Sequence, residues 1–325
     1  MSHLTKEQRY TISVMIENRY SQKQIAEAIG KNKSVISREL KRNCDMRSGK
    51  YNFDLAQRKY EKRKQEKSNS QTFTPVIKQT IDELISLDLS PEQIVGRLKL
   101  EGKPTVSHER IYQYLWNDKK EGGLLYLHLR RKGRKYRKRG NAKDTRGIIK
   151  DRVGIEHRPE IVNKKQRIGD FEIDTIIGQN HKGAILSIND RVSSKVWIAK
   201  LNGKNAEELA RKTVEILKPF KSMIHTITGD NGKEFAEHKI IAKELGIDFY
   251  FARPYHSWER GANENTNGLI RQYFPKGTSF ENITNADIKR VQNILNNRPR
   301  KKLNYLTPNE FLNLNLSKSK VAFVA

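Results

Sequence analysis

The order of the apolar segments after about residue 165 constrains the fold of this chain more than any other feature. Three segments with strand-like patterning come first, in DFEIDTIIG, GAILSINDRVS and KVWIAKLNG, and short turns at 179–183 and 190–194 join them. A helix in NAEELARKTVEILKPF, a strand in HTITGDNG, a helix in KIIAKELG and a strand in IDFYFA then follow. This series predicts a mixed five-stranded sheet with helices on both faces.

The same element order is that of a ribonuclease-H-like α/β fold, which we place at residues 163–282, with a C-terminal helix and tail at 283–325. A chain of 325 residues exceeds the usual size of one domain. The preceding residues have helical patterning, so the chain is predicted to be multidomain, with all-α domains before the α/β domain. The predicted segments are a helix-turn-helix domain at 1–46, a basic polar extension and linker at 47–72, a second helical, helix-turn-helix-like domain at 73–118 and a basic linker at 119–162.

Residues 4–43 predict three short helices with recognisable ends. Thr5, Ser21 and Asn32 are placed to cap the helices, and Gly30 is placed to end the second one. A helix, a tight turn and a helix with a polar, basic outer face are typical of a helix-turn-helix, whose second helix enters the major groove of DNA. The alternative is a plain three-helix bundle with a solvated face. The predicted DNA-binding residues are Lys33, Ser34, Ser37, Arg38, Lys41 and Arg42.

Residues 74–117 repeat this pattern. TPVIKQTIDELISL, LSPEQIVGRLKL and VSHERIYQYLW predict three helices, the second capped by Ser90 with Pro91 in its first turn. A purely structural helical domain is the alternative to a second DNA-binding domain. The residues of the third helix predicted to contact bases or phosphates are Ser107, His108, Arg110 and Gln113.

The segment RRKGRKYRKR at 130–139 holds eight cationic side chains in ten positions. Such a run is predicted to be solvated or bound to phosphate, giving affinity and salt dependence with little sequence preference. An unstructured tail or a nuclear-type address is the alternative. The predicted phosphate contacts are Arg130, Arg131, Lys132, Arg134, Lys135, Arg137, Lys138 and Arg139.

The overall charge favours a nucleic-acid partner and a cytoplasmic, nucleoid-associated location. The net charge is +27 and the pI about 10.0, so the chain attracts polyanions, of which DNA or RNA is the commonest. A ribosome-like or merely solubilised surface is the alternative. Cys44 is the single cysteine, which excludes a disulfide framework and a cysteine-ligated zinc site. No apolar run approaches a membrane span, and MSHLTKEQRY lacks the apolar segment of a signal peptide.

Three acidic residues lie in three different predicted elements. Asp174 lies within the first strand, Asp230 closes the fourth and Glu264 starts the helix that follows the fifth. The first and fourth strands are neighbours in such a sheet, so the two aspartates are expected to meet at one edge, with Glu264 reaching in from above. Carboxylates are the ligands that Mg²⁺ prefers, and paired Mg²⁺ ions catalyse phosphoryl transfer.

Each acidic residue also has an ordinary structural interpretation. Asp170, Glu172 and Asp174 share one face of their strand, so alternation does not choose among them. Asp190 lies in a predicted turn and is interpreted as a turn former. Asp230 precedes Asn-Gly, a turn signal, and Glu264 is favoured in a first helical turn by the helix dipole.

The motifs around these three residues are similar to those of a known family. FEID, TGDNGKEF and ERGANENTNGLIRQYFPKGT resemble the signature of DDE transposases with a retroviral-integrase-like core, and most closely the bacterial insertion-sequence family numbered thirty. The 33 residues between Asp230 and Glu264, the N-terminal helix-turn-helix and the closing LNYLTPNEFL match as well, so the resemblance covers nearly the whole chain. Phe171 departs from the family's usual Trp but keeps an apolar aromatic.

The resemblance implies a site and a reaction. Asp174, Asp230 and Glu264 would be catalytic and hold two Mg²⁺ ions, with Mn²⁺ as a substitute. The expected activity is binding to the terminal inverted repeats of a mobile element, followed by strand cleavage and strand transfer into target double-stranded DNA. Bringing two DNA ends together implies a homodimer or a higher oligomer.

Two further residues and two rival functions stay open. Asn267 and Arg271 follow Glu264 at i+3 and i+7 and are predicted to point toward DNA, with simple surface solvation as the alternative. One rival function is a metal-dependent nuclease that only hydrolyses DNA. The other is a sequence-specific DNA-binding repressor whose α/β domain is vestigial.

Overall fold

The computed structural model describes residues 3–45, 47–69, 73–132, 149–253 and 256–322. The chain divides into two compact units, Met1–Pro75 and Val76–Ala325, which are described here one at a time. In the described parts of both units, no helix is long and apolar enough to cross a membrane.

The first unit begins with the three predicted helices. Thr5 and Ser21 each form a capping box with the Gln three residues later, and the Asn32 side chain accepts from the Ser34 backbone N–H, so all three predicted caps are confirmed. Gly30 follows the second helix with a φ of +62°, which a residue without Cβ adopts without strain. The helices are α1 (Lys6–Glu17), α2 (Gln22–Ala28) and α3 (Lys33–Asn43).

A fourth helix, α4 (Phe53–Asn69), completes this unit, where the sequence predicted only a polar extension and linker. Its Ala56 is fully buried in the same core as Ile12, Ile25 and Ile36, so the first turns of α4 pack against the other helices. The polar composition concealed this helix because only its N-terminal part carries apolar contacts.

A buried ion pair joins α1 to α3. Arg9 is 3% exposed and its Nε donates to Oε1 of Glu39 over 2.9 Å, while Tyr51 Oη donates to the same oxygen over 3.0 Å. The Arg9 Nη1 is also satisfied, by the Leu4 carbonyl and the Gln57 side chain. Removing either partner of such a buried ion pair would leave an uncompensated charge in the core and destabilise the fold.

The second unit starts with the other three predicted helices. These helices pack with the α/β core in the same compact unit. Arg97 makes a bidentate ion pair with Glu310 (2.7 and 2.8 Å), and Gln93 Nε2 donates to the Pro299 carbonyl. Tyr273 Oη donates to Asp88 over 2.9 Å. The helices are α5 (Pro75–Ser86), α6 (Pro91–Leu100) and α7 (His108–Lys120), and the C-terminal helix that carries Glu310 is α13 (Pro308–Ala322).

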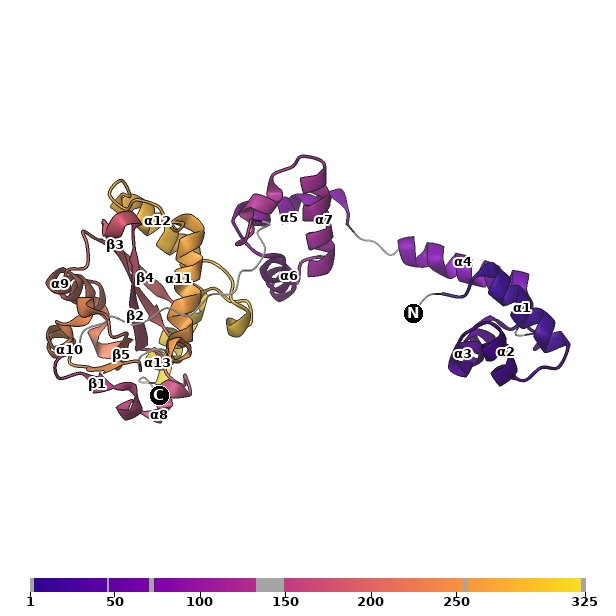
Figure 1. Ribbon diagram of the computed structural model, residues 1–325, viewed down its shortest axis with the longest axis horizontal. Helices are drawn as coiled ribbons and strands as arrows, with labels where there is room; N and C mark the ends of the chain where they lie inside the picture. The colour runs from indigo at the N-terminus through magenta and orange to yellow at the C-terminus, as the bar shows by residue number, and fades with distance from the viewer. Residues whose placement is uncertain (1–2, 46, 70–72, 133–148, 254–255, 323–325) are drawn as a thin grey trace. The chain divides into compact units, whose positions relative to one another are not determined.

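The sheet has the order β1-β6-β5-β2-β3-β4 (Figure 1). β2, β3 and β4 are antiparallel neighbours, and β2 pairs in parallel with β5, as β5 does with β6. This confirms the predicted ribonuclease-H-like order, including the central pairing of the first and fourth predicted strands. The strands are β1 (Val153–Gly154), β2 (Asp170–Ile177), β3 (Ala184–Asp190), β4 (Val196–Leu201), β5 (Thr226–Gly229) and β6 (Asp248–Phe251).

The predicted count of five strands is wrong by one. The sixth strand, β1, has two residues that pair in parallel with Tyr250 and Phe251 of β6, and it lies in the stretch predicted as linker. Two residues are too few to produce an alternating pattern, so the sequence carried no strand signal there. The short helix α8 (Glu160–Asn163) also falls in that stretch.

Helices cover both faces of the sheet (Figure 1). On one face, α9 and α10 bury Leu209 and Ile241 against β2 and β5. On the other, α11 and α12 bury Ile270 and Val291 against the outer antiparallel strands, so α12 belongs to the core and not to a separate C-terminal tail. The helices are α9 (Ala206–Leu217), α10 (His238–Leu245), α11 (Gly261–Tyr273) and α12 (Asn285–Asn296).

We predict that Glu39→Gln destabilises the first unit by about 3 kcal/mol, because it leaves the buried Arg9 without a counter-charge. Hydrogen exchange of the α1–α3 amides in the full chain measures this loss directly. The exposed Glu27→Gln is the matched control and should leave protection unchanged. Equal protection in the Glu39 and Glu27 variants would contradict a stabilising pair.

Candidate active site

The pairing of β2 with β5 brings Asp174 and Asp230 together. The two strands run parallel with Asp170, Phe171 and Glu172 opposite Thr226, Ile227 and Thr228. Continued two residues further, the same register places Asp230, which directly follows β5, level with Asp174 in the middle of β2. Both side chains are mostly buried, at 19% and 21% exposed. We call these two residues the aspartate pair.

The other acidic residues near Asp174 have partners that give them structural roles. Asp170 is bound by Arg167 and by the Thr226 hydroxyl. Glu172 lies 3.1 Å from the Arg191 guanidinium in a fully buried ion pair. Asp190 accepts from the backbone N–H groups of the turn that follows β3, which confirms its interpretation as a turn former.

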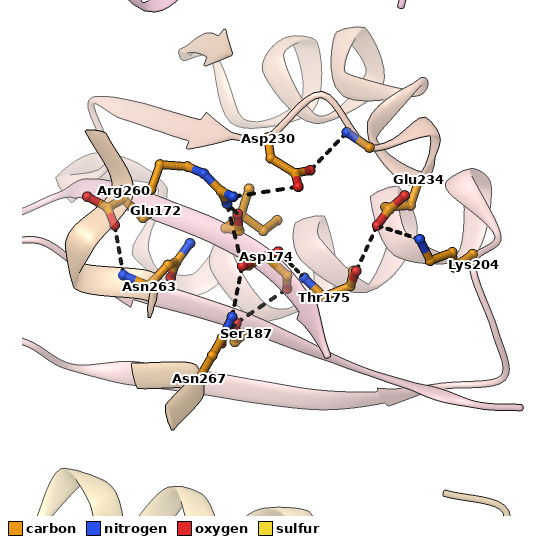
Figure 2. Close-up of polar contacts among 12 residues, drawn as sticks. Glu172, Asp174, Thr175, Ser187, Lys204, Asp230, Glu234, Arg260, Asn263 and Asn267 are labelled. Atoms are coloured by element: carbon orange, nitrogen blue, oxygen red, sulfur yellow. Dashed lines mark hydrogen bonds and ion pairs between the residues drawn. The ribbon is translucent and has the colours of Figure 1, made fainter. Parts of the chain in front are cut away.

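A guanidinium lies between the two carboxylates of the aspartate pair. Arg260 Nη1 is 3.5 Å from Asp174 Oδ2, and Nη2 is 3.5 Å from Asp230 Oδ2 (Figure 2). Arg260 ends the short 3₁₀ helix Ser257–Arg260 and directly precedes α11. One side chain therefore neutralises part of the negative charge of both strands.

Three other groups shape the electrostatics of Asp174. The Thr175 backbone N–H donates to Oδ1 and Asn267 Nδ2 donates to Oδ2, both over 2.8 Å. Burial, opposed by Arg260 and reinforced by the negative charge of Asp230, raises the pKa of Asp174 from 3.8 to about 6. Burial therefore disfavours the charged form of the Asp174 carboxylate.

Helix α11 is bound to the sheet along the side that faces the aspartate pair. Its Asn263 N–H donates to Glu172 over 2.9 Å, and the Thr266 hydroxyl donates to Asn189. Glu264 lies on this helix between Asn263 and Asn267, and it is exposed. Among the described residues, no group of three or more His, Cys, Asp or Glu side chains is arranged to hold a metal ion, so Glu264 does not complete such a group with the aspartate pair.

The prediction that Asn267 and Arg271 point toward DNA stays a prediction, and the structure shows what these side chains bond within the chain. Asn267 bonds Asp174 and accepts from the Ser187 hydroxyl over 2.9 Å, so it orients the aspartate. Arg271 donates to the carbonyls of Ile177, Phe274 and Pro275 and lies over the Phe280 ring. Both side chains lie on a helix face that meets β2 and β3, where Asn267 bonds Asp174 and Ser187 and Arg271 bonds the Ile177 carbonyl.

The predicted DNA-binding side chains of the two helical segments are exposed. On α3 these are Lys33, Ser34, Ser37, Arg38, Lys41 and Arg42, and on α7 they are Ser107, His108, Arg110 and Gln113. Ser107 also caps α7, and Arg38 folds back on Ser34, so these two side chains have a local structural role as well.

The basic run is only partly described. Arg130, Arg131 and Lys132 are exposed, and Arg130 donates to the Asn265 side chain over 3.1 Å. Arg130 therefore has a contact within the protein as well, and its predicted contact with phosphate stays a prediction. Arg134, Lys135, Arg137, Lys138 and Arg139 lie outside the described residues.

Two residues contribute to this site without having been predicted from the sequence. Arg260 was not recognised, because it directly precedes α11 and its contacts are with Asp174 and Asp230, which are distant in the sequence. Glu234 was missed as well: it is buried, it accepts from the Thr175 hydroxyl over 2.8 Å, and Lys204 lies 3.5 Å from it (Figure 2). Its negative charge also raises the pKa of Asp174.

We predict that Asp174→Asn stabilises the protein by about 1–3 kcal/mol at pH 8. The folded-state pKa of Asp174 is raised, so the folded protein holds this proton more tightly, and stability falls as the pH rises from about 4 through 6. The gain from Asn should therefore disappear near pH 4. Thermal unfolding between pH 4 and 8, in EDTA, measures it.

The exposed Glu244→Gln is a carboxylate-to-amide control in the same unit and should show no such pH dependence. An Asp174→Asn variant that is less stable than the parent at pH 8 would show that Arg260 and Asn267 stabilise the charged carboxylate more than its burial disfavours it.

Comparison with known proteins identifies the family to which the chain is similar. Residues 1–43 match the model of a helix-turn-helix domain. The chain is 58% identical over 323 residues to the transposase for insertion sequence element IS4351 of Bacteroides fragilis, covering 99% of both chains. It is 32% identical over 323 residues to transposase InsI for insertion sequence element IS30A of Escherichia coli strain K12, covering 96% of this chain and 84% of that one.

Among solved structures, the catalytic core domain of BIV integrase aligns with 46% of this chain and 98% of its own, at 20% identity and a TM-score of 0.38. The family assignment rests on the full-length sequence relatives, and it confirms the resemblance drawn from the motifs around Asp174, Asp230 and Glu264. The chain belongs to the family of insertion-sequence transposases that includes those of IS4351 and IS30A.

Proposed function

We propose that this transposase binds the terminal inverted repeats of its element and catalyses metal-dependent strand cleavage and strand transfer at the aspartate pair. The observation that carries the proposal is the meeting of Asp174 and Asp230 at one edge of the sheet, each 3.5 Å from the same guanidinium. Two mostly buried carboxylates that share one cation form a strongly cation-attracting position. Glu264, in the first turn of α11, would be the third acidic residue.

The residues present suit a divalent metal with a preference for oxygen ligands. Carboxylate oxygens are the ligands of Mg²⁺, and an added positive charge would stabilise two adjacent, mostly buried carboxylates. Asp174, Asp230 and Glu264 would hold the ions. Glu264 is exposed in the first turn of α11, and its neighbours Asn263 and Asn267 bond residues of β2. Bound Mg²⁺ would activate the attacking oxygen and stabilise the leaving oxygen of the phosphodiester.

The surrounding residues would position the ligands. Asn267 and the Thr175 N–H fix both oxygens of Asp174, so its orientation is set before anything binds. The Gly232 N–H does the same for Asp230 over 2.9 Å. Glu172 holds the first turn of α11 through the Asn263 N–H, directly beside Glu264. Preorganised ligands of this kind lower the reorganisation needed during the reaction.

The helix-turn-helix of the first unit would supply recognition of the DNA ends. The second helix of such a motif enters the major groove, and the matching helix α3 presents four exposed cations, Lys33, Arg38, Lys41 and Arg42. The net charge of +27 adds affinity without sequence preference. Two ends have to be held together for strand transfer, so we also propose that the chain acts as a dimer or higher oligomer on DNA.

We expect Glu264→Gln to lower strand cleavage and joining by at least about 100-fold, a loss that even outer-shell partners of metal ligands can reach, with binding to the DNA end nearly unchanged. The assay uses a labelled duplex with the element's own terminal repeat, in Mg²⁺, Mn²⁺ or EDTA. Glu244→Gln is the matched control. Equal loss of binding and cleavage would mean that Glu264 is structural.

The same assay separates the rival functions. Joined strands support a transposase reaction, whereas cut strands alone would support a nuclease. Tight binding without any cut in either metal would support a repressor with a vestigial core.

A second prediction concerns α3. Arg42→Ala should weaken binding to the terminal repeat and reduce the slope of log K against log salt by about one, if Arg42 contacts a phosphate. Lys243→Ala, an exposed cation on α10, is the matched control for general loss of charge. Identical effects of the two variants would contradict a specific role for α3.

A further inference from the structure

Arg260 is held in the position where a metal ion would be expected between the aspartate pair. Its two terminal nitrogens each lie 3.5 Å from a different aspartate, and its side chain is 13% exposed. Nη1 also donates to the Ile173 carbonyl over 3.3 Å, which holds the guanidinium against β2. The planar fork of a guanidinium suits this bridging of two acceptors.

The charge balance of the site explains why this cation is needed in the metal-free protein. Asp174, Asp230 and Glu234 all lie near one another, and each of the latter two raises the pKa of Asp174. Lys204 contacts Glu234, and Arg260 contacts both members of the aspartate pair (Figure 2). The Arg260 guanidinium therefore offsets part of the repulsion between two mostly buried carboxylates.

The backbone at Arg260 allows its side chain to move without unfolding a helix. Arg260 has a φ of −122° and a ψ of 39°, which are not helical values, and it lies where the 3₁₀ helix ends and α11 begins. Asn263, Thr266, Asn267 and Arg271 all bond α11 to the sheet. These bonds do not depend on Arg260.

We propose that Arg260 is a built-in counter-ion of the aspartate pair that competes with the divalent metal. Its guanidinium keeps Asp174 and Asp230 close and oriented in the metal-free protein, and it leaves the pair when a metal ion binds. Arg260 is thus a positioning residue that sets how much free metal the site requires. This inference rests on the proposed metal-dependent function.

The test measures Mn²⁺ binding to the full-length protein without DNA. Binding is monitored by the loss of the EPR signal of free Mn²⁺. Removing a competing cation should tighten binding, so Arg260→Gln should lower the dissociation constant by about fivefold or more, the usual lower range of coupling between two linked sites. Arg260→Lys keeps the positive charge but loses the planar fork of the guanidinium. Its dissociation constant for Mn²⁺ should fall between those of the parent and Arg260→Gln. The Asp174→Asn, Asp230→Asn double variant defines binding elsewhere on the chain.

A second measurement guards against a general effect on the fold. In EDTA, Arg260→Gln should melt at a lower temperature than the parent because the pair is uncompensated, yet Mn²⁺ should raise its melting temperature by more. If Arg260 had a purely structural role, Arg260→Gln would bind Mn²⁺ more weakly than the parent, and Mn²⁺ would raise its melting temperature by less. Lys204→Gln is the control, because it removes one positive charge beside Glu234, close to the aspartate pair. It should change the dissociation constant by less than twofold, since we attribute the effect of Arg260 to its direct contact with the pair and not to a general loss of local positive charge.

The outcomes separate the two proposals. Tighter binding in Arg260→Gln alone supports the counter-ion. Equal or weaker binding in that variant, or equal tightening in Lys204→Gln, overturns the counter-ion and leaves the proposed function standing. Absence of Mn²⁺ binding in both the parent and Arg260→Gln would overturn the metal-dependent function and the counter-ion with it.

Discussion

The parallel pairing of β2 with β5 is the constraint on which the rest of this site depends. It places Asp174 and Asp230 side by side in a largely buried setting, where two like charges repel. A structure that served stability alone would avoid this arrangement. The groups that surround the pair counter the repulsion: Arg260 supplies positive charge, and Asn267 and the Thr175 N–H donate hydrogen bonds to Asp174.

β2 also fixes the third acidic residue, through a different set of bonds. Its Glu172, paired with Arg191 in the core, accepts from the first turn of α11, and Asn267 ties the next turn to Asp174. Glu264 lies between these two attachments. The same strand therefore carries one member of the aspartate pair and positions the helix that carries Glu264, so a change in β2 reaches both.

Much of this architecture could be predicted from the sequence because its signals are local. The alternation in DFEIDTIIG and GAILSINDRVS, the caps at Thr5, Ser21 and Asn32, and the turn at Asp190 each depend on a few neighbouring residues. Strand order followed from the succession of elements, and with it the meeting of Asp174 and Asp230.

The parts that escaped prediction depend on contacts between distant residues. β1 is two residues long and exists because β6 offers it a free edge. The choice among Asp170, Glu172 and Asp174 is made by Arg167 and Arg191, which no periodicity reveals. Asn267 and Arg271 were assigned to the correct helix face, but what that face meets is decided by the fold. Arg260 lies 86 positions after Asp174, and no local sequence pattern indicates that contact.

Anomalous diffraction from crystals of the full-length protein soaked in Mn²⁺ tests the central claim most directly, because it locates the metal and the arginine in one experiment. We predict an anomalous peak bound by Asp174 and Asp230, with the Arg260 guanidinium displaced from its position between them. A guanidinium still bridging the two carboxylates at saturating Mn²⁺, with no peak beside them, would contradict it.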